Sequence, residues 1–120
     1  MKSENPSVAS TPQPPYYAVI FTSLRTEGDN GYGEMAARMA ELVAQQPGYL
    51  GMESAREGVG ITVCYWKDLE SIEGWRRIEE HLLAQKYGRE RWYRQFAARI
   101  CRVERAYSFD ASQGAASTRT

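Results

Sequence analysis

The stretch over residues 61–93, ITVCYWKDLESIEGWRRIEEHLLAQKYGRERWY, decides the fold of this chain. It begins with residues that are mostly β-branched or aromatic, which is typical of a strand. Asp68 follows at once, and an aspartate in this position commonly caps a helix. The residues at helical spacing beyond it are Leu69, Ile72, Trp75, Glu79 and Leu82. The sequence therefore predicts a strand over 61–67 and a helix over 69 to about 85.

The chain before this stretch predicts a strand, a helix and a second strand. Residues 16–24 (YYAVIFTSL) are β-branched and aromatic. Asp29 or Asn30 can cap the helix, whose apolar positions are Tyr32, Met35, Ala36, Met39, Leu42 and Val43. Pro47-Gly48 ends this helix near Gln45. Residues 49–56 form a weaker strand, which a turn over 57–60 joins to the next one.

The chain after this stretch predicts a short helical segment over 89–98 and a last strand over 100–109. Gly88 separates the segment from the preceding helix. The apolar face of the last strand takes the odd positions Cys101, Val103, Tyr107 and Phe109. The order β-α-β-β-α-β indicates an α+β, ferredoxin-like fold, in which two helices cover one face of a four-stranded antiparallel sheet. The strand order in space is then fourth, first, third, second.

Composition excludes several classes of protein. Lys plus Arg and Asp plus Glu are both 15, so the net charge is zero, which argues against binding to nucleic acid or to an anionic membrane surface. No apolar run reaches the roughly 20 residues of a membrane span, and the start lacks a secretory signal. The two cysteines, Cys64 and Cys101, fall on strands separated by the first strand, too far apart to bridge. These features predict a cytoplasmic protein.

The ends of the chain differ in composition from its centre. Residues 1–15 hold four of the five prolines, and residues 110–120 are mostly Ser, Ala, Gly and Thr. Both segments lack the apolar residues of a core, so we expect a disordered N-terminal arm and a disordered tail around one domain over 16–109.

The strand over 61–67 is apolar on both sides. Ile61, Val63 and Tyr65 take one side, while Cys64 and Trp66 take the other. A sheet with one face in water alternates apolar and polar residues. We therefore expect a second sheet to cover the open face, and a symmetric homodimer supplies one at least cost.

Several short motifs resemble the antibiotic biosynthesis monooxygenase domain family. They are Tyr65-Trp66 at the end of a strand, Trp75 in a helix, HLLAQ at 81–85, GRERWY at 88–93 and RVERAYSF at 102–109. The resemblance covers about 16–109 and implies a dimeric α+β barrel with a cavity between the helices and the sheet of each subunit. Some members oxidise polycyclic phenols or anthrones to quinones with dioxygen, without metal or flavin. Other members degrade haem.

The haem-degrading branch of the family is tested by its own signature. That branch has an asparagine late in the first strand and a histidine ten residues after a tryptophan in the second helix. Trp75 matches the tryptophan, but Gln85 stands ten residues on, and the first strand offers Thr22 or Ser23. His81 is six residues on, one helical turn short of the required place. Haem degradation is therefore disfavoured, and no metal site is expected.

The candidate site residues each have a functional and a structural interpretation. His81 is the candidate general base, because its ordinary pKa suits neutral pH, although it also fits a surface position near a helix end. Arg89 is a candidate partner for an anionic or phenolate ligand, with a solvated helix face as its alternative. The candidate walls of an aromatic substrate pocket, which equally suit a plain core, are Trp66, Trp75, Trp92 and Tyr93.

Two functions remain open at this point. The resemblance implies a monooxygenase that uses no cofactor and oxidises a small aromatic or quinol-like molecule with dioxygen. The alternative is a dimer of the same fold that binds a small molecule without catalysis. The lack of an unambiguous catalytic pair in the sequence favours this alternative.

Overall fold

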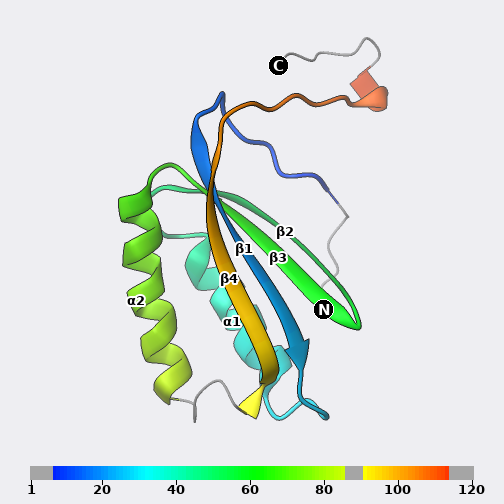
Figure 1. Ribbon diagram of the computed structural model, residues 1–120, viewed down its shortest axis with the longest axis vertical. Coiled ribbons are helices and arrows are strands. Elements are labelled where there is room, and N and C mark those ends of the chain that lie inside the picture. The colour runs from blue at the N-terminus through cyan, green and yellow to red at the C-terminus, as the bar shows by residue number, and fades with distance from the viewer. Residues whose placement is uncertain (1–6, 86–90, 114–120) are drawn as a thin grey trace.

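A computed structural model describes residues 7–85 and 91–113 of the chain. Figure 1 shows six main elements and a short terminal 3₁₀ helix. In order they are β1 (Tyr16–Arg25), α1 (Tyr32–Val43), β2 (Tyr49–Glu57), β3 (Val59–Trp66), α2 (Leu69–Gln85), β4 (Tyr93–Val103) and η2 (Ala111–Gln113). The predicted β-α-β-β-α-β order is confirmed.

The four strands form one antiparallel sheet in the order β2-β3-β1-β4, as predicted. Both helices lie against the same face of this sheet (Figure 1). Val19 of β1 pairs with Cys64 of β3, and Ala18 pairs with Cys101 of β4. The two cysteines therefore flank β1 on opposite sides, and both are free thiols.

Aspartates bind backbone N–H groups at the starts of both helices, although the N-cap of α1 is Gly31 and not the predicted Asp29 or Asn30. Asp29 accepts hydrogen bonds from the backbone N–H groups of Gly31 and Gly33, at 3.0 and 3.1 Å. Asp68 accepts one from the N–H of Ser71 at 2.8 Å, so its predicted capping role is confirmed. Hydrogen bonds from Ser71 also hold the pKa of Asp68 below its usual range. Each helix thus begins at a position that its sequence specifies.

β4 begins earlier in the chain than predicted, and the predicted helical segment over 89–98 is wrong over residues 93–98. Residues 93–98 are strand, paired with β1 in a register that runs from Tyr16 opposite Val103 to Arg25 opposite Tyr93. Pairing along the whole of β1, with Phe96 packed on Phe21, outweighs the local helical pattern.

The apolar face of β4 also differs from the prediction. Phe96, Ala98 and Ile100 face the helices, whereas the side chain of Cys101 lies on the opposite face. Tyr107 lies beyond the strand and is 77% exposed, as is Phe109 at 66%. The predicted apolar positions are odd-numbered, whereas the observed ones are even-numbered. A shift of one residue moves every side chain of a strand to the other face of the sheet.

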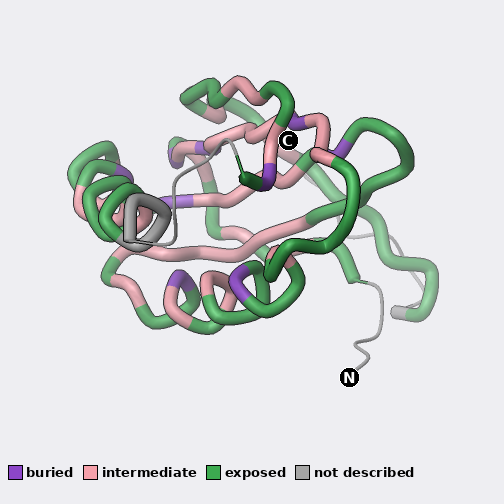
Figure 2. The backbone as a smooth tube through the Cα atoms, turned by 90° about the horizontal axis from the view of Figure 1, so that it is seen from below, coloured by how far each residue is buried: buried purple, intermediate pink, exposed green. Residues whose placement is uncertain are grey.

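The densest core lies where the end of α1 meets the start of α2. Val43, Trp66 and Ile72 are each at most 4% exposed and pack together. Tyr49 meets Trp66 edge-on, with ring centroids 5.8 Å apart. Figure 2 shows that buried positions occur in both helices and in the sheet, where the elements face one another. We call Val43, Trp66, Ile72 and Tyr49 the packed end.

The opposite face of the sheet contacts the segment that precedes β1. The backbone N–H of Ala9 donates a hydrogen bond to Glu53 at 2.9 Å, and the Thr11 and Tyr16 hydroxyls lie 2.8 Å apart. Tyr65 donates to the other Glu53 oxygen at 2.7 Å. The domain limits at 16 and 109, and disorder outside them, stay predictions. Among residues 7–85 and 91–113, neither helix is long and apolar enough to cross a membrane.

Candidate functional site

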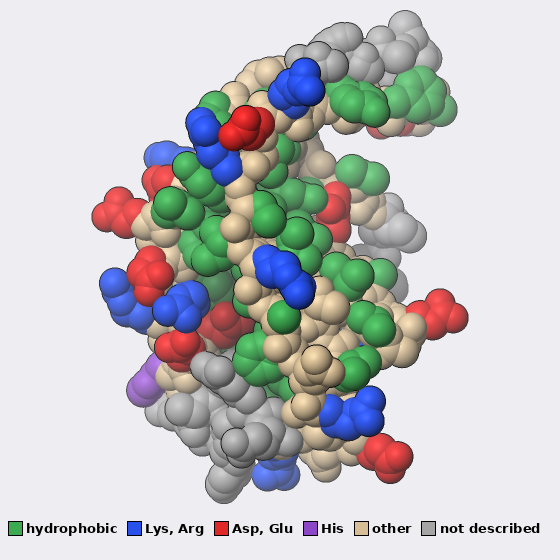
Figure 3. Space-filling model, in the orientation of Figure 1, with side chains coloured by type: hydrophobic (Ala, Val, Ile, Leu, Met, Phe, Trp, Pro, Cys, Tyr) green, Lys and Arg blue, Asp and Glu red, His purple; other side chains and the backbone are tan. Residues whose placement is uncertain are grey.

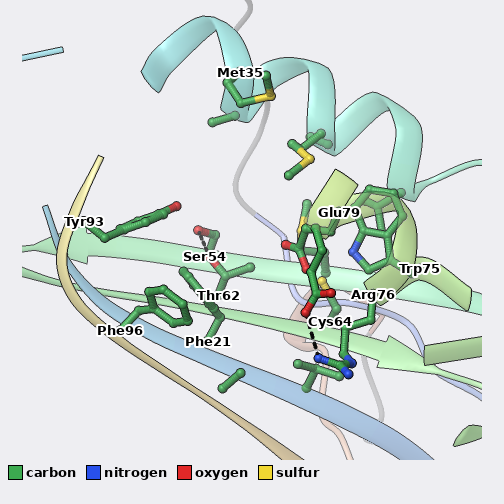
Figure 4. A pocket seen from close by; sticks show the side chains of 18 of the residues that line it. Phe21, Met35, Ser54, Thr62, Cys64, Trp75, Arg76, Glu79, Tyr93 and Phe96 are labelled. Carbon is green, nitrogen blue, oxygen red and sulfur yellow. Dashed lines mark hydrogen bonds and ion pairs between the residues drawn. The ribbon is translucent and has the colours of Figure 1, made fainter. Parts of the chain in front are cut away.

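A cavity of about 600 Å³ lies between the two helices and the sheet. This volume falls within the roughly 300–1,000 Å³ of small-molecule sites. Its walls are mostly apolar and come from both helices and all four strands, including Tyr32, Met35, Met39, Trp75, Glu79, Val19, Phe21, Ser54, Thr62, Cys64, Tyr93, Phe96 and Ile100 (Figure 4). Sites of this composition bind an apolar molecule and orient it with a few polar groups.

The cavity reaches the surface beside β4. Ile100 lines the cavity and is also 51% exposed, and its neighbour on the same face, Ala98, is exposed as well. Figure 3 shows hydrophobic side chains at the surface on both sides of β4, next to the charged side chains of α2. An apolar ligand therefore meets apolar surface before it is enclosed.

Four aromatic rings close one end of the cavity, and we call Phe21, Phe96, Tyr93 and Tyr32 the aromatic cluster. Phe21 and Phe96 stack with centroids 5.2 Å apart. Tyr93 meets Phe21, Phe96 and Tyr32 edge-on at 5.4, 5.7 and 5.8 Å. Stacked and edge-on rings are the geometries that aromatic pairs prefer, and they extend readily to a planar aromatic ligand.

Trp92 fixes the start of β4 and hence the place of Tyr93. It is 3% exposed, and its indole N–H donates a hydrogen bond to the Asn30 carbonyl at 2.9 Å. Its own carbonyl accepts hydrogen bonds from Arg25 Nε at 2.9 Å and from the Thr26 N–H at 3.0 Å. These bonds join the loop before α1 to the start of β4.

The Tyr93 phenol is a hydrogen-bond donor at neutral pH. Burial raises the pKa of Tyr93 most, and the adjacent Tyr32 phenol and the Glu79 carboxylate raise it further. The positive charge of Arg56 lowers the pKa of Tyr93, but by less than these effects raise it. Arg25 lies 3.7 Å from the centre of the Tyr32 ring, which steadies the second phenol of the pair.

The floor of the cavity carries small polar groups from β2 and β3. The hydroxyls of Ser54 and Thr62 lie 3.0 Å apart in a hydrogen bond (Figure 4). Burial, and then the Glu79 charge, raises the pKa of Cys64 to about 12. Cys64 is therefore a neutral thiol and a poor nucleophile at neutral pH. Within the described residues, no three His, Cys, Asp or Glu side chains gather as a metal site would require.

Glu79 brings a carboxylate into this apolar space, and no role was predicted for it. Its side chain is half-buried and points into the cavity from α2, opposite Tyr93 of β4 (Figure 4). Its negative charge contributes to raising the pKa of both Cys64 and Tyr93. The signal in the sequence was a carboxylate on the same helical stripe as Ile72 and Trp75, since such a stripe faces the interior.

The predicted site residues fall into four groups. Trp75, Trp92 and Tyr93 line the cavity together. Trp66 belongs instead to the packed end, where it is 1% exposed and outside the cavity lining. His81 is an exposed side chain on α2, the purple group in Figure 3, and is absent from the described lining. Arg89 lies outside the described residues.

Comparisons with known proteins agree on the family. The model of the antibiotic biosynthesis monooxygenase family matches residues 15–87. The uncharacterized protein YqjZ of Bacillus subtilis (strain 168) is 51% identical over 104 residues, covering 85% of this chain and 91% of YqjZ.

Solved structures share the fold at low sequence identity. A mutant of SnoaB, a cofactor-independent oxygenase from Streptomyces nogalater, has a TM-score of 0.61 and 13% identity, covering 76% of this chain and 95% of SnoaB. PA3566 from Pseudomonas aeruginosa has a TM-score of 0.58 and 17% identity, covering 78% of this chain and 97% of PA3566. The family match and the likeness to YqjZ together show that this chain belongs to the antibiotic biosynthesis monooxygenase family.

Proposed function

We propose that this protein is a monooxygenase that uses no cofactor and oxidises a small aromatic or quinol-like molecule with dioxygen. The observation that carries the proposal is the aromatic cavity between the helices and the sheet, whose polar groups are few and placed on different walls. Membership of the family supports it, as does the shared fold with SnoaB, which is a cofactor-independent oxygenase.

The protein contributes to this reaction by binding the substrate, removing a proton from it and excluding water. The substrate loses a proton from carbon, and the carbanion then transfers electrons to dioxygen as a C–O bond forms. The resulting peroxide anion takes up a proton to become a hydroperoxide, which loses water as the O–O bond breaks and leaves a carbonyl group. One molecule of dioxygen is thereby reduced to the product oxygen and one water. A cavity walled by Phe21, Phe96 and Trp75 holds a planar substrate away from water during these steps.

A small-molecule carrier of the same fold is the second candidate. The exposed position of His81, the base predicted from the sequence, favours this candidate. The cavity would then hold an aromatic ligand without changing it.

We also propose that two copies of this cytoplasmic protein pair through the open faces of their sheets. Ile61 lies on that face and is 46% exposed, next to Val59 at 47%. Pairing would cover these apolar side chains. Light scattering at micromolar concentration should report a dimer for the wild type and a monomer for Ile61→Lys. A monomeric wild type would overturn this assembly.

Dioxygen uptake tests the proposed reaction. Purified, metal-free protein is mixed with a panel of anthrones, quinols and flavonols, and boiled protein serves as the blank. We expect uptake in proportion to protein, with a quinone or other carbonyl product identified by mass spectrometry. His81→Ala shows whether the exposed histidine takes part, because loss of a general base lowers turnover by roughly a hundredfold or more. Tight binding of panel members without uptake would favour the carrier instead.

A further inference from the structure

We infer that Glu79 and Tyr93 are the catalytic pair of this cavity. Glu79 accepts the proton that leaves the substrate carbon, and the Tyr93 phenol donates a hydrogen bond to the substrate oxygen on which negative charge develops. This inference rests on the proposed monooxygenase function and assigns its proton acceptor to a residue other than His81.

The two side chains face each other across the space a ligand would fill. Glu79 projects from α2 and Tyr93 from β4, and both line the same cavity (Figure 4). The Glu79 charge acts on the Tyr93 phenol, so the two groups belong to one electrostatic environment. A ring with an acidic C–H on one edge and a carbonyl or phenolic oxygen on the opposite edge reaches both.

Glu79 suits the role of base better than its charged neighbours on α2. Glu80 is exposed and bonded to Arg76 at 3.0 Å, with both side chains about half accessible. His81 lies two residues beyond Glu79, which places it about 200° away around the helix. Only Glu79 of these groups is half-buried among apolar side chains, where a carboxylate interacts more strongly with a bound ligand.

Tyr93 suits the role of donor because it is held in place and keeps its proton. The stacked Phe21 and Phe96 rings contact Tyr93 on one side, and the Tyr32 ring contacts it on another. Trp92, which precedes it in the chain, is held by a hydrogen bond to Asn30. The neighbouring carboxylate and phenol both favour its neutral form. A pre-positioned donor of this kind stabilises an oxyanion at no cost of reorganisation.

The pair also completes the proton balance of the reaction. The substrate proton moves to Glu79, and the carbanion charge spreads to the oxygen that Tyr93 contacts. After the C–O bond to dioxygen forms, Glu79 returns its proton to the outer peroxide oxygen. Cleavage of the O–O bond with loss of the second proton on carbon releases water and leaves the carbonyl group.

Turnover of variants tests the inference on the full-length protein. Glu79→Gln should lower kcat by roughly a hundredfold or more with little change in KM, and Glu79→Asp should retain part of the activity. Tyr93→Phe should lower kcat by roughly a hundredfold. The matched control is Glu70→Gln, an exposed carboxylate in the first turn of the same helix that is absent from the cavity lining. Equal turnover of Glu79→Gln and wild type would overturn the inference and leave the proposed function standing.

A bound dye gives a readout that needs no turnover. A hydroxyanthraquinone changes colour when its phenol ionises, and it lacks the acidic C–H that the reaction removes because its central-ring carbons are already carbonyls. Removing the Glu79 charge in Glu79→Gln should shift the ionisation of the bound dye to lower pH by about one unit or more, the effect of a nearby like charge. An unshifted dye would overturn the inference. A shifted dye with no oxidation of any panel member would overturn the proposed function instead, leaving Glu79 as the group that faces the ligand.

Discussion

The space between the helices and the sheet is filled at one end and hollow at the other. At the packed end, Val43 of α1, Trp66 of β3 and Ile72 of α2 meet with almost no exposure. Val43 and Ile72 also border the cavity, and about two helical turns away from them Met35 and Glu79 of the same helices line its hollow part. The same two helices thus serve stability at one end and ligand binding at the other, because the size and polarity of the stripe residues change along them.

The largest expected difference in stability is between two tryptophans. Trp66→Ala should lower the free energy of unfolding by about 3–5 kcal/mol, because it leaves a void in a closed core. Trp75→Ala should cost clearly less, because Trp75 is only partly buried and already borders open space. Urea denaturation of both variants measures the difference. Equal losses would mean that the cavity end contributes as much to stability as the packed end.

A smaller effect is expected at Gly48, which sits in the turn beside the start of α2. Its φ of 83° is a conformation that favours glycine, and an added Cβ would collide with the side chain of Ser71. Gly48→Ala should cost about 2 kcal/mol or more by thermal or urea unfolding. Gly58→Ala is the matched control, since its φ is 81° but nothing lies within 4 Å. A Gly58→Ala loss as large as that at Gly48 would show that crowding against α2 is unimportant.

Alkaline pH should lower the free energy of unfolding, because the buried Cys64 thiol on the cavity floor loses its proton more readily in the unfolded chain. Burial raises the pKa of Cys64 from 9.0 to about 12, so the folded protein holds its thiol proton more tightly than the unfolded chain. This contribution is complete below pH 9 and is lost as the pH rises toward 12. The loss should be about 1 kcal/mol near pH 10. Cys64→Ala should flatten the decline in stability measured between pH 8 and 10, and an unchanged slope would contradict the assignment.

The smallest effect on stability is expected for a substitution that fills the cavity. Ala98→Leu points into open space from β4 and should change the free energy of unfolding by less than about 1 kcal/mol. It should nevertheless weaken binding of the hydroxyanthraquinone dye at least tenfold, because the two occupy the same volume. Ala44→Leu, at the exposed end of α1, is the control for dye binding. Undiminished binding in Ala98→Leu would place the ligand elsewhere.

Periodicity alone was enough to predict most of the elements. The first five come from alternating or helical patterns that end at Asp68, Pro47 and Gly58, where the backbone must change course. The start of β4 was missed because its pairing partner, β1, is remote in sequence and only the fold brings the two together. Its two faces were exchanged for the same reason.

The site was harder to predict than the fold, because lining a cavity and filling a core need the same residue types. Trp66 and Trp75 look alike in the sequence, and their different surroundings depend on how far along the helix pair each one sits. His81 is exposed on α2, whereas Glu79 lies on the apolar stripe and lines the cavity. Helical phase therefore indicates which polar side chain faces the interior, and residue chemistry alone does not.

The edge strand β4 lies beyond the segment that matches the family, and this matters for choosing which residues to express. The family match ends at residue 87, whereas β4 runs over Tyr93–Val103. A gene fragment cut at the limits of the family signature would lose one of the two partners of β1 along its whole length, together with Trp92, Tyr93 and the Phe96 wall of the cavity. In such a fragment β1 would pair with β3 alone and become an open edge strand rich in apolar residues, and we expect the fragment to aggregate.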